Sequence, residues 1–296
     1  MTATLIVGCG DLGRRIAAKL LRQGASVTGL VRSDKSAQQL AHEGVTPCIA
    51  DLDTAIAPIN IDAKHLLYLA PPPPQGSVDT RMQHFLDAVS GTPKSLIYLS
   101  TTGVYGDCHG AWIDETATVA PKAERAKRRL DAEQQIRQKA TREGWPHIII
   151  RVAGIYGPNR LPLQRLESQE PLLCADQAPF TNRIHVDDLA SIILALGEKG
   201  RNGEIYNVTD GQPGNMTDYF MRVADFAGLP HPPTISMAEA QGVLSKGLLS
   251  YLKESRRLSN AKLMADLELE LELELEYPTL DDGLAAIFNR SPEDLQ

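Results

Sequence analysis

The sequence predicts an α/β protein with a central parallel sheet, and two observations predict it. Short apolar runs alternate with amphipathic segments from residue 4 to residue 208, which is typical of β–α–β units. The apolar runs are also nearly continuous in Ile, Val and Leu, as expected of strands that helices cover on both faces. We expect strands at 4–7, 26–31, 46–49, 65–69, 95–100, 147–152 and 204–208, and helices at 14–23, 35–43, 78–90, 127–143 and 184–197.

The first expected strand ends in a glycine-rich turn, Gly-Cys-Gly-Asp-Leu-Gly at 8–13, and a helical pattern follows it directly. Gly8 permits a tight turn, Gly10 lets the backbone approach a pyrophosphate, and Gly13 lets the helix pack close to the strand. The helix N-terminus would then face the phosphates. This context predicts a Rossmann-type, doubly wound sheet that binds a dinucleotide, with Asp11 and Leu12 also in the cofactor turn.

Composition excludes several classes of function. The chain has 296 residues and a net charge of −7, which argues against binding to nucleic acid or to an anionic membrane surface. Its 4 cysteines are scattered without a Cys-x-x-Cys pair, so we expect a cytoplasmic protein without a disulfide or zinc framework. We find no secretion signal and no apolar stretch long enough to cross a membrane.

The pattern changes after residue 152. Residues 153–183 are rich in loops and prolines, and the segments beyond residue 211 are helical and interrupted by prolines. We therefore expect a smaller C-terminal substrate lobe that closes over one end of the sheet. The expected division is 1–158 plus 184–212 for the cofactor-binding domain, and 159–183 plus 213–296 for the smaller lobe.

Residues 267–276 are five Leu-Glu dipeptides. Both residue types favour helices, but a period of two fits a strand with one leucine face and one glutamate face. We expect an acidic strand or an extended arm, and the alternative is a functional acidic surface.

The end of the second expected strand bears on the choice of nucleotide. An NAD-selective site places a carboxylate there to accept the ribose 2′-hydroxyl. This chain has Arg32 and Ser33 instead, and Asp34 comes slightly late. A guanidinium and a hydroxyl suit a 2′-phosphate, so we expect NADP(H) to be preferred over NAD(H). The alternative is that Arg32 is only an exposed residue at a strand end.

Two further strand ends are candidates for the cofactor site. Asp51 and Leu52 follow the third strand, where Asp51 either accepts from the adenine amino group or is a turn residue. Residues 69–71 follow the fourth strand and begin a proline run that either walls the dinucleotide or is a plain connection. The cofactor-lining positions expected at this strand end are Leu69, Ala70 and Pro71.

Four stretches resemble the extended and atypical short-chain dehydrogenase/reductase superfamily, including its epimerase/dehydratase branch. Besides residues 8–13, they are Tyr-Leu-Ser-Thr-Thr-Gly-Val-Tyr-Gly-Asp at 98–107, Arg-Val-Ala-Gly-Ile-Tyr-Gly-Pro at 151–158 and Asn-Arg-Ile-His-Val-Asp-Asp-Leu-Ala at 182–190. Weaker similarity follows at 256–260 and 277–278. The glycine turn is one residue shorter than is usual in the extended subgroup, which indicates an atypical one. The resemblance implies a small-molecule substrate and, as the superfamily's habit, a homodimer.

The resemblance also implies a site of a strand-end hydroxyl, a Tyr acid/base and a Lys that lowers the Tyr pKa. Thr101 stands at the hydroxyl position, and Ser100 and Ala153 are expected beside the cofactor. The Tyr-x-x-x-Lys motif is lost, because Arg125 stands at the Tyr position and Arg129 at the Lys position. Arginine stays protonated, so Arg125 cannot transfer a proton, whereas Arg129 can contact the cofactor ribose or an anionic substrate. The arginines of this helix can equally form a solvated face.

Two tyrosines are candidates for a substitute acid, Tyr105 and Tyr156, and for each the alternative is a packing role. Asn182 and Arg183 are expected to reach a bound ligand. We assign the residues that follow, from 185 to 188, to helix capping and not to a metal site, because their spacing is a poor zinc signature.

Two functions remain open from the sequence. The first is an NADP-preferring oxidoreductase or epimerase-like enzyme that acts on a small polar, for example sugar-like, substrate. The second is a catalytically inactive NADP(H)-binding sensor or regulator on the same fold, because a fold does not determine a function.

Overall fold

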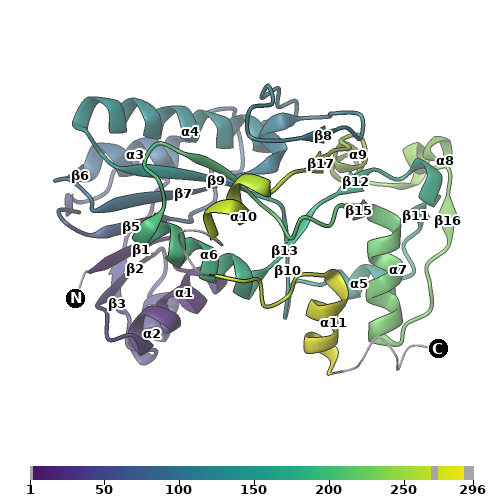
Figure 1. The fold of residues 1–296 in the computed structure, drawn as a ribbon, viewed down its shortest axis with the longest axis horizontal. Coiled ribbons are helices and arrows are strands. Elements are labelled where there is room, and N and C mark those ends of the chain that lie inside the picture. Colours follow the sequence, from purple (N-terminus) through teal and green to yellow (C-terminus); the bar gives the residue numbers. More distant parts are fainter. Residues whose placement is uncertain (1–2, 268–272, 290–296) are drawn as a thin grey trace.

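A computed structural model describes residues 3–267 and 273–289 of the chain. Its centre is a seven-stranded, all-parallel sheet, which confirms the predicted α/β fold (Figure 1). The seven strands are β1 (Thr4–Val7), β2 (Val27–Val31), β3 (Thr46–Ile49), β5 (His65–Tyr68), β7 (Ser95–Thr101), β9 (His147–Val152) and β14 (Ile205–Val208). All seven strands expected from the sequence are therefore present.

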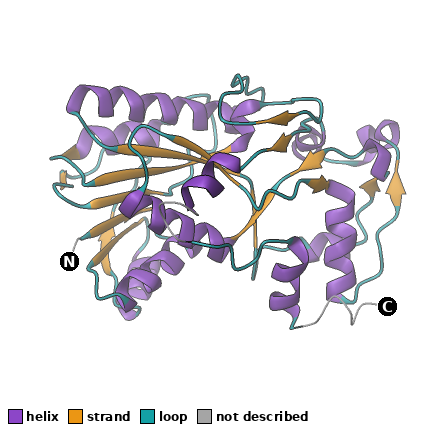
Figure 2. Cartoon of the chain, viewed as in Figure 1, coloured by secondary structure: helices purple, strands orange, loops and turns teal. Residues whose placement is uncertain are grey.

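Helices cover both faces of this sheet (Figures 1 and 2). Those that pack on one face are α1 (Asp11–Arg22), α2 (Asp34–His42) and α6 (Val186–Lys199), and those on the other are α3 (Thr80–Ala88) and α4 (Glu124–Glu143). Helices α1 and α4 each begin three residues before the expected start, α1 within the glycine turn at 8–13 and α4 in a first turn that carries Glu124 and Arg125.

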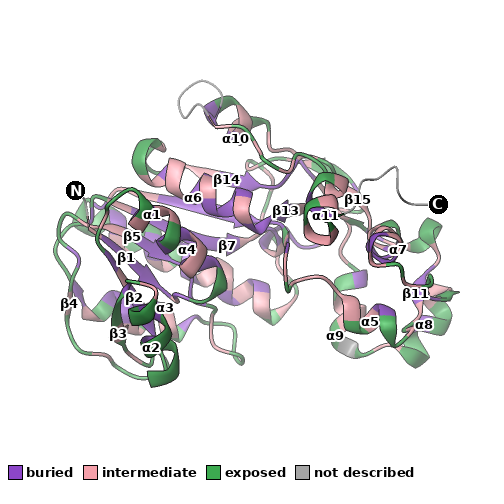
Figure 3. Cartoon of the chain, turned by 90° about the horizontal axis from the view of Figure 1, so that it is seen from below, coloured by how far each residue is buried: buried purple, intermediate pink, exposed green. Residues whose placement is uncertain are grey.

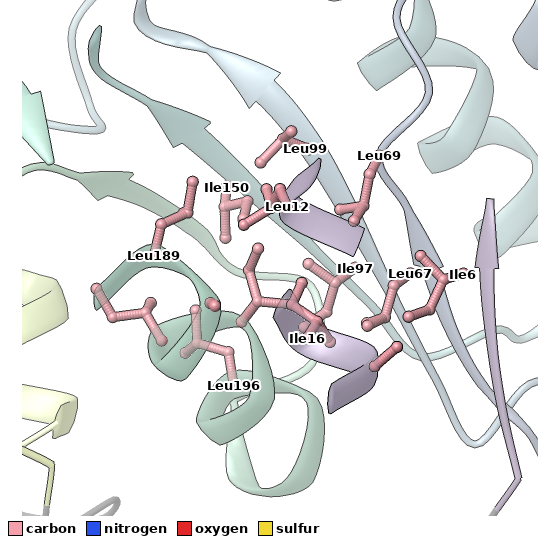
Figure 4. Packing of buried hydrophobic residues seen from close by; sticks show 14 of the residues in the cluster. Ile6, Leu12, Ile16, Leu67, Leu69, Ile97, Leu99, Ile150, Leu189 and Leu196 are labelled. Atoms are coloured by element: carbon pink, nitrogen blue, oxygen red, sulfur yellow. The ribbon is translucent and has the colours of Figure 1, made fainter. Parts of the chain in front are cut away.

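The core consists of two apolar layers, one on each side of the sheet. Figure 4 shows Ile6, Leu67 and Ile97 of the strands meeting Ile16 of α1 and Leu196 of α6 on one face. Figure 3 shows the consequence: the strands are buried, apart from the mostly exposed edge strand β3, whereas the helices expose one side to solvent. Burial on both faces explains why the strands have no polar alternation in the sequence.

The strand order places the cofactor turn. The order across the sheet is β14-β9-β7-β5-β1-β2-β3, so the chain builds outward from β1 to β3 and then returns to β5 on the other side of β1. Ligands of open α/β sheets bind at the carboxyl ends of the strands where the order reverses. The glycine turn after β1 lies at this point.

The C-terminal half of the chain adds short elements beyond the carboxyl ends of the strands. Its helices are α5 (Leu163–Glu167), α7 (Met216–Ala227), α8 (Met237–Val243), α9 (Lys246–Leu252), α10 (Ala261–Asp266) and α11 (Leu280–Phe288). Short two-stranded pairs join β10 (Gly154–Tyr156) to β13 (Arg183–His185), β11 (Leu172–Leu173) to β16 (Thr234–Ile235), β12 (Phe180–Thr181) to β15 (Gly214–Asn215) and β8 (Trp112–Ile113) to β17 (Arg257–Leu258). A separate pair, β4 (Ile59–Asn60) with β6 (Val89–Ser90), lies in the N-terminal half of the chain, before β5 and β7. Helices α5, α7 and α11 share one hydrophobic cluster, and α8 and α9 share another.

Helix α10, which falls within the expected smaller lobe, packs against the large sheet. Leu263 and Leu267, in and just after α10, are buried in the same cluster as the large sheet, and the Tyr206 hydroxyl of β14 donates to Asp266 at 2.6 Å. This segment therefore belongs with the sheet and not with the smaller lobe, since its apolar side chains complete the sheet's core. The division of the remaining chain into two domains stays a prediction.

The Leu-Glu run lies only partly in the described chain. Residues 268–272 are outside it, and residues 273–276 are not in a strand, although Leu273 and Leu275 pack against the core of the sheet. Among the described residues, no helix combines the length and the apolar character needed to cross a membrane.

Candidate functional site

Two cavities lie along the carboxyl ends of the strands. The larger one, of about 560 Å³, lies beyond β7 and β9, and the smaller one, of about 400 Å³, lies beyond β1 and β2. Pro72, in the proline run after β5, lines both cavities, so the two cavities are neighbours. They lie side by side along the edge of the sheet where the strand order reverses.

The glycine turn has the geometry that its sequence predicts. Gly8 has a φ of +82°, and a Cβ there would lie 2.6 Å from the backbone of Ala70. At Gly13 a Cβ would lie 3.1 Å from Ile6, so a small residue lets α1 approach β1 closely. At Gly10, which caps α1, a Cβ would have nothing described within 4 Å of it. The backbone at the N-terminus of α1 is thus accessible to a phosphate-bearing ligand.

The side chains of the other two residues of the turn, Asp11 and Leu12, contact other residues of the protein and not the cofactor space. The Asp11 carboxylate accepts from Arg160 at 2.8 Å and pairs with Arg15 at 3.4 Å. The Leu12 side chain is buried in the core. Any contact of Leu12 with a cofactor must therefore come from its backbone.

The smaller cavity contains most of the positions expected to hold the adenosine end of a cofactor. Its lining includes Gly8, Arg32, Asp51, Leu52, Ala70 and Pro71. The Arg32 side chain is 69% exposed, and an oxygen of the Asp53 carboxylate lies 3.8 Å from its guanidinium. Asp53 is bound more closely by Arg81, at 2.6 Å, so Arg32 has a guanidinium available for a ligand.

Three side chains that were expected to contact the cofactor at the smaller cavity also have, or have instead, a role within the protein. The Ser33 hydroxyl caps α2 by accepting from the N–H of Ser36 at 3.3 Å. The Asp51 carboxylate accepts from the N–H of Asp53 at 3.0 Å, which is a turn role and leaves its second oxygen for a ligand. The Leu69 side chain belongs to the buried core and does not line the cavity.

The larger cavity brings together residues that are far apart in the sequence. The predicted site residues that line it are Thr101, Arg125, Arg129, Ala153, Tyr156, Asn182 and Arg183. Thr101 ends β7, and its hydroxyl oxygen accepts from the N–H of Gly103 at 3.2 Å. The hydroxyl proton of Thr101 therefore stays available for a ligand oxygen.

The arginines at the Tyr and Lys positions of the superfamily are held in different ways. Arg129 donates to the carbonyl of Leu99 at 2.7 Å and to that of Ala70 at 3.3 Å, so it ties together the ends of β7 and β5. Arg125 stacks on the ring of Tyr251, with 3.6 Å from its guanidinium carbon to the ring centroid, and donates to the Ser250 hydroxyl at 2.9 Å. Both side chains border the cavity and neither forms a solvated helix face.

Tyr105 and Ser100 do not line the cavity. The Tyr105 hydroxyl donates to Asn207 at 2.7 Å, and its ring is only 1% exposed. Burial raises the pKa of Tyr105. Its turn faces inward because Val104, Tyr105 and Leu258 form one hydrophobic cluster, so the expectation that Tyr105 faces the site is corrected. The Ser100 hydroxyl donates to the buried Glu133 at 2.5 Å.

Tyr156 and Asn182 line the cavity, but their polar atoms have protein partners. The Tyr156 hydroxyl donates to the carbonyl of Thr279 at 3.2 Å, and burial raises the Tyr156 pKa well above its usual value. The Asn182 amide donates to the carbonyl of Arg256 at 3.0 Å and accepts from Leu258 at 2.8 Å. Neither tyrosine proposed as a substitute acid therefore has a free hydroxyl at the cavity.

The segment after β13 has the capping role that we expected. The His185 ring accepts from the N–H of Asp187 at 3.3 Å at the start of α6, and Asp188 accepts from the N–H groups of Glu276 and Tyr277 at 2.8 and 3.1 Å. Within residues 3–267 and 273–289, no cluster of three or more His, Cys, Asp or Glu side chains could hold a metal ion.

The residues that the C-terminal half contributes to the larger cavity could not be predicted from the sequence. They are Phe180, Met216, Tyr219, Phe220, Tyr251, Glu254 and Arg256. Only Arg256 lies in a stretch with a sequence signal, the weak similarity at 256–260. The others lie on short elements whose pattern does not distinguish a cavity-lining side chain from a packed one.

Two known families and several curated proteins match parts of the chain. Residues 80–209 match the NAD dependent epimerase/dehydratase family, and residues 4–65 match a second family, ketopantoate reductase PanE/ApbA. Among curated proteins, a 4-hydroxy-2-methyl-3-oxo-4-farnesyl-3,4-dihydroquinoline-1-oxide ketoreductase of Stigmatella aurantiaca is 23% identical over 75% of this chain and 72% of its own. The dTDP-D-glucose 4,6-dehydratase of Homo sapiens is 27% identical, over 39% of this chain and 35% of its own.

Solved structures match over nearly the whole chain. A conserved protein of unknown function from Silicibacter pomeroyi DSS has a TM-score of 0.78 and 28% identity, over 98% of this chain and 99% of that one. A UDP-glucuronic acid 4-epimerase from Bacillus cereus, solved in complex with NAD, has a TM-score of 0.73 and 18% identity over 97% and 98%. The second likeness extends to the fold alone.

Proposed function

We propose that the chain belongs to the NAD-dependent epimerase/dehydratase family, whose model matches residues 80–209, and that it is an NADP(H)-preferring oxidoreductase or epimerase-like enzyme acting on a small polar substrate. One observation carries this proposal. The cavity at the glycine turn and the cavity at Thr101 share Pro72 and together follow the carboxyl edge of the sheet. A dinucleotide needs such a path, since its two ends lie at different strands.

The residues along this path suit the parts of a dinucleotide. The smaller cavity would take the adenosine end, and the exposed backbone at Gly10 would take the pyrophosphate. The larger cavity would then hold the nicotinamide end and the substrate, beside Thr101 and Arg129. When bound there, the nicotinamide supplies or accepts the hydride.

The preference for NADP(H) rests on Arg32. Its guanidinium follows β2 and lines the smaller cavity, and its contact with Asp53 is a loose one at 3.8 Å. A planar guanidinium can bind a 2′-phosphate with two hydrogen bonds, whereas a carboxylate at the strand end would repel that phosphate.

The chemistry proposed for the larger cavity uses orientation and fixed positive charge. The Thr101 hydroxyl would donate to the substrate oxygen, and the fixed positive charge of Arg129 would stabilise the negative charge that develops on that oxygen during carbonyl reduction. The proton that completes the alcohol would come from solvent, because an arginine does not release one.

The alternative function is a non-catalytic NADP(H) sensor, and one observation favours it. Arg125 occupies the position of the superfamily's acid and is engaged by Tyr251 and Ser250, while neither Tyr105 nor Tyr156 has a free hydroxyl at the cavity.

Turnover separates the two functions. NADPH consumption would be followed with a panel of carbonyl compounds that includes keto sugars and keto acids. We expect at least one substrate, and we expect Thr101→Ala to lower its kcat/KM by about a hundredfold, the typical loss when one donor to a developing oxyanion is removed. The matched control is Thr141→Ala, an exposed threonine on α4 that should leave the rate unchanged.

If NADPH binds but no panel member turns over, the result favours the sensor. If a substrate turns over and Thr101→Ala has no effect, the proposed catalytic site is wrong.

A further inference from the structure

The lining of the larger cavity carries more positive than negative side chains. Of the described residues that line it, four are arginines and one, Glu254, is acidic. Glu254 is already paired with Arg256 at 3.1 Å, and Arg256 also donates to the carbonyl of Gly106. Arg129 is bound to the carbonyls of two strand ends. The two arginines that remain are Arg125 and Arg183.

Arg183 is half-buried and has no acidic partner among the residues that the structure describes. It begins β13, and its guanidinium carbon lies 3.6 Å from the ring centroid of Tyr219. Across the described residues, no carboxylate oxygen comes within 4.0 Å of its guanidinium, although Asp210 lies close enough to influence it. Burial lowers the pKa of Arg183. A guanidinium that is partly removed from water in this way is stabilised when an anion joins it.

Arg125, on α4, is held in a similar way to Arg183. Its guanidinium also stacks on a tyrosine ring at 3.6 Å, that of Tyr251 in α9, and its polar partner is the neutral Ser250 hydroxyl. In the described part of the chain no carboxylate oxygen lies within ion-pair distance of it. Stacking on an aromatic ring orients a guanidinium and leaves its edge free for hydrogen bonds.

We infer that the substrate of this cavity is an anion, and that Arg183 and Arg125 bind its carboxylate or phosphate oxygens. The fork of a guanidinium matches both groups in two parallel hydrogen bonds. The inference rests on the proposed function in one respect, which is that Thr101 lines the same cavity and would act on the same molecule. It concerns a different site from the Arg32 cavity, which would take the cofactor's 2′-phosphate.

Calorimetric titration without nucleotide tests the inference independently of the cofactor. The probes are malonate for a carboxylate, inorganic phosphate for a phosphate group, and malonamide as a neutral analogue of malonate, all at low ionic strength because salt screens such contacts. We expect malonate or phosphate to bind and malonamide not to bind. The tighter of the two anions identifies the class of substrate.

The variants Arg183→Gln and Arg125→Gln are each expected to weaken that binding about ten- to a hundredfold, as loss of hydrogen bonds to a charged group does. The control is Arg142→Gln, on the same helix as Arg125 but 69% exposed and paired with Glu143, which should bind like the wild type. Arg183→Lys keeps the charge without the fork, so it should bind more weakly than the wild type and more tightly than Arg183→Gln.

The inference is overturned if neither anion binds, if malonamide binds as tightly as malonate, or if Arg125→Gln and Arg183→Lys both bind like the wild type. The Arg125 variant keeps the test decisive even if Arg183→Gln fails to fold. A parallel titration with NADPH separates the two proposals. Anion binding without NADPH binding contradicts only the proposed function, and NADPH binding without anion binding contradicts only this inference.

Discussion

Replacing Glu133 with alanine is expected to lower the free energy of unfolding by about 3–5 kcal/mol, the usual cost of leaving one member of a buried ion pair alone. Glu133 of α4 and Arg151 of β9 are 1% and 3% exposed. The arginine donates to both carboxylate oxygens, at 2.8 and 3.1 Å, and Ser100 of β7 donates to one of them at 2.5 Å. Denaturation by urea, followed by circular dichroism, measures the change.

Two controls make this result specific. Glu143→Ala, at the exposed end of the same helix, should change the free energy of unfolding by less than about 0.5 kcal/mol, as surface changes usually do. The double change Glu133→Ala with Arg151→Met should recover most of the loss, because no charge is then left buried. A single variant as stable as the wild type would contradict the account, and so would a double variant no more stable than the single one.

This ion pair also bears on the site. Ser100 precedes Thr101 on β7, and the Arg151 guanidinium lies 4.9 Å from the ring centroid of Tyr105. The buried pair therefore connects α4, β7, β9 and the turn after β7 directly beneath the larger cavity. Its contribution is to hold Thr101 in place and not to touch the ligand.

The second large effect on stability is expected at one glycine of the turn at 8–13 and not at another. Gly8→Ala should lower the free energy of unfolding by about 2–5 kcal/mol, since a side chain at positive φ costs about 1–2 kcal/mol and overpacking about 1–3 kcal/mol. At this position φ is +82°, and the new Cβ would lie 2.6 Å from backbone atoms of Ala70. The backbone there cannot yield as a flexible side chain would.

Gly10→Ala is the matched variant. Gly10 has a φ of −82° and no described atom within 4 Å of a Cβ position, so the protein should unfold at the same urea concentration as the wild type. Its affinity for NADPH should nevertheless fall, because the added methyl group would occupy the space that the pyrophosphate approaches. Unfolding by urea with and without NADPH measures both effects. A Gly10→Ala protein that binds NADPH normally would contradict the proposed position of the pyrophosphate.

Much of the fold could be predicted because local rules determine it. Six of the seven strands of the sheet are largely buried and rich in Ile, Val and Leu, so their apolar runs mark them, whereas the edge strand β3 is mostly exposed. The turn at 8–13 could be predicted because Gly8 has a positive φ that favours glycine and Gly13 stands where a small residue is needed. Helix starts were less accurate, since capping residues carry little periodicity.

The site was harder to predict, because the elements that line its cavity are far apart in the sequence. Tyr105 was expected at the site from its turn, but the direction of that side chain depends on packing against Leu258, which lies far along the chain. Tyr219 and Tyr251 could not be found because an aromatic residue that stacks on an arginine looks, in sequence, like one that fills a core. Arg125 could be placed beside the cavity only through the resemblance.

The most direct test of the account is calorimetric titration with NADPH, NADP⁺, NADH and NAD⁺, of the wild type and of Arg32→Ala. We expect the phosphorylated nucleotides to bind the wild type about ten- to a hundredfold more tightly than NADH and NAD⁺, and Arg32→Ala to abolish that difference while still binding NADH. If the wild type binds none of the four nucleotides, or binds NADH as tightly as NADPH, the central claim of an NADP(H)-preferring site on this sheet is wrong.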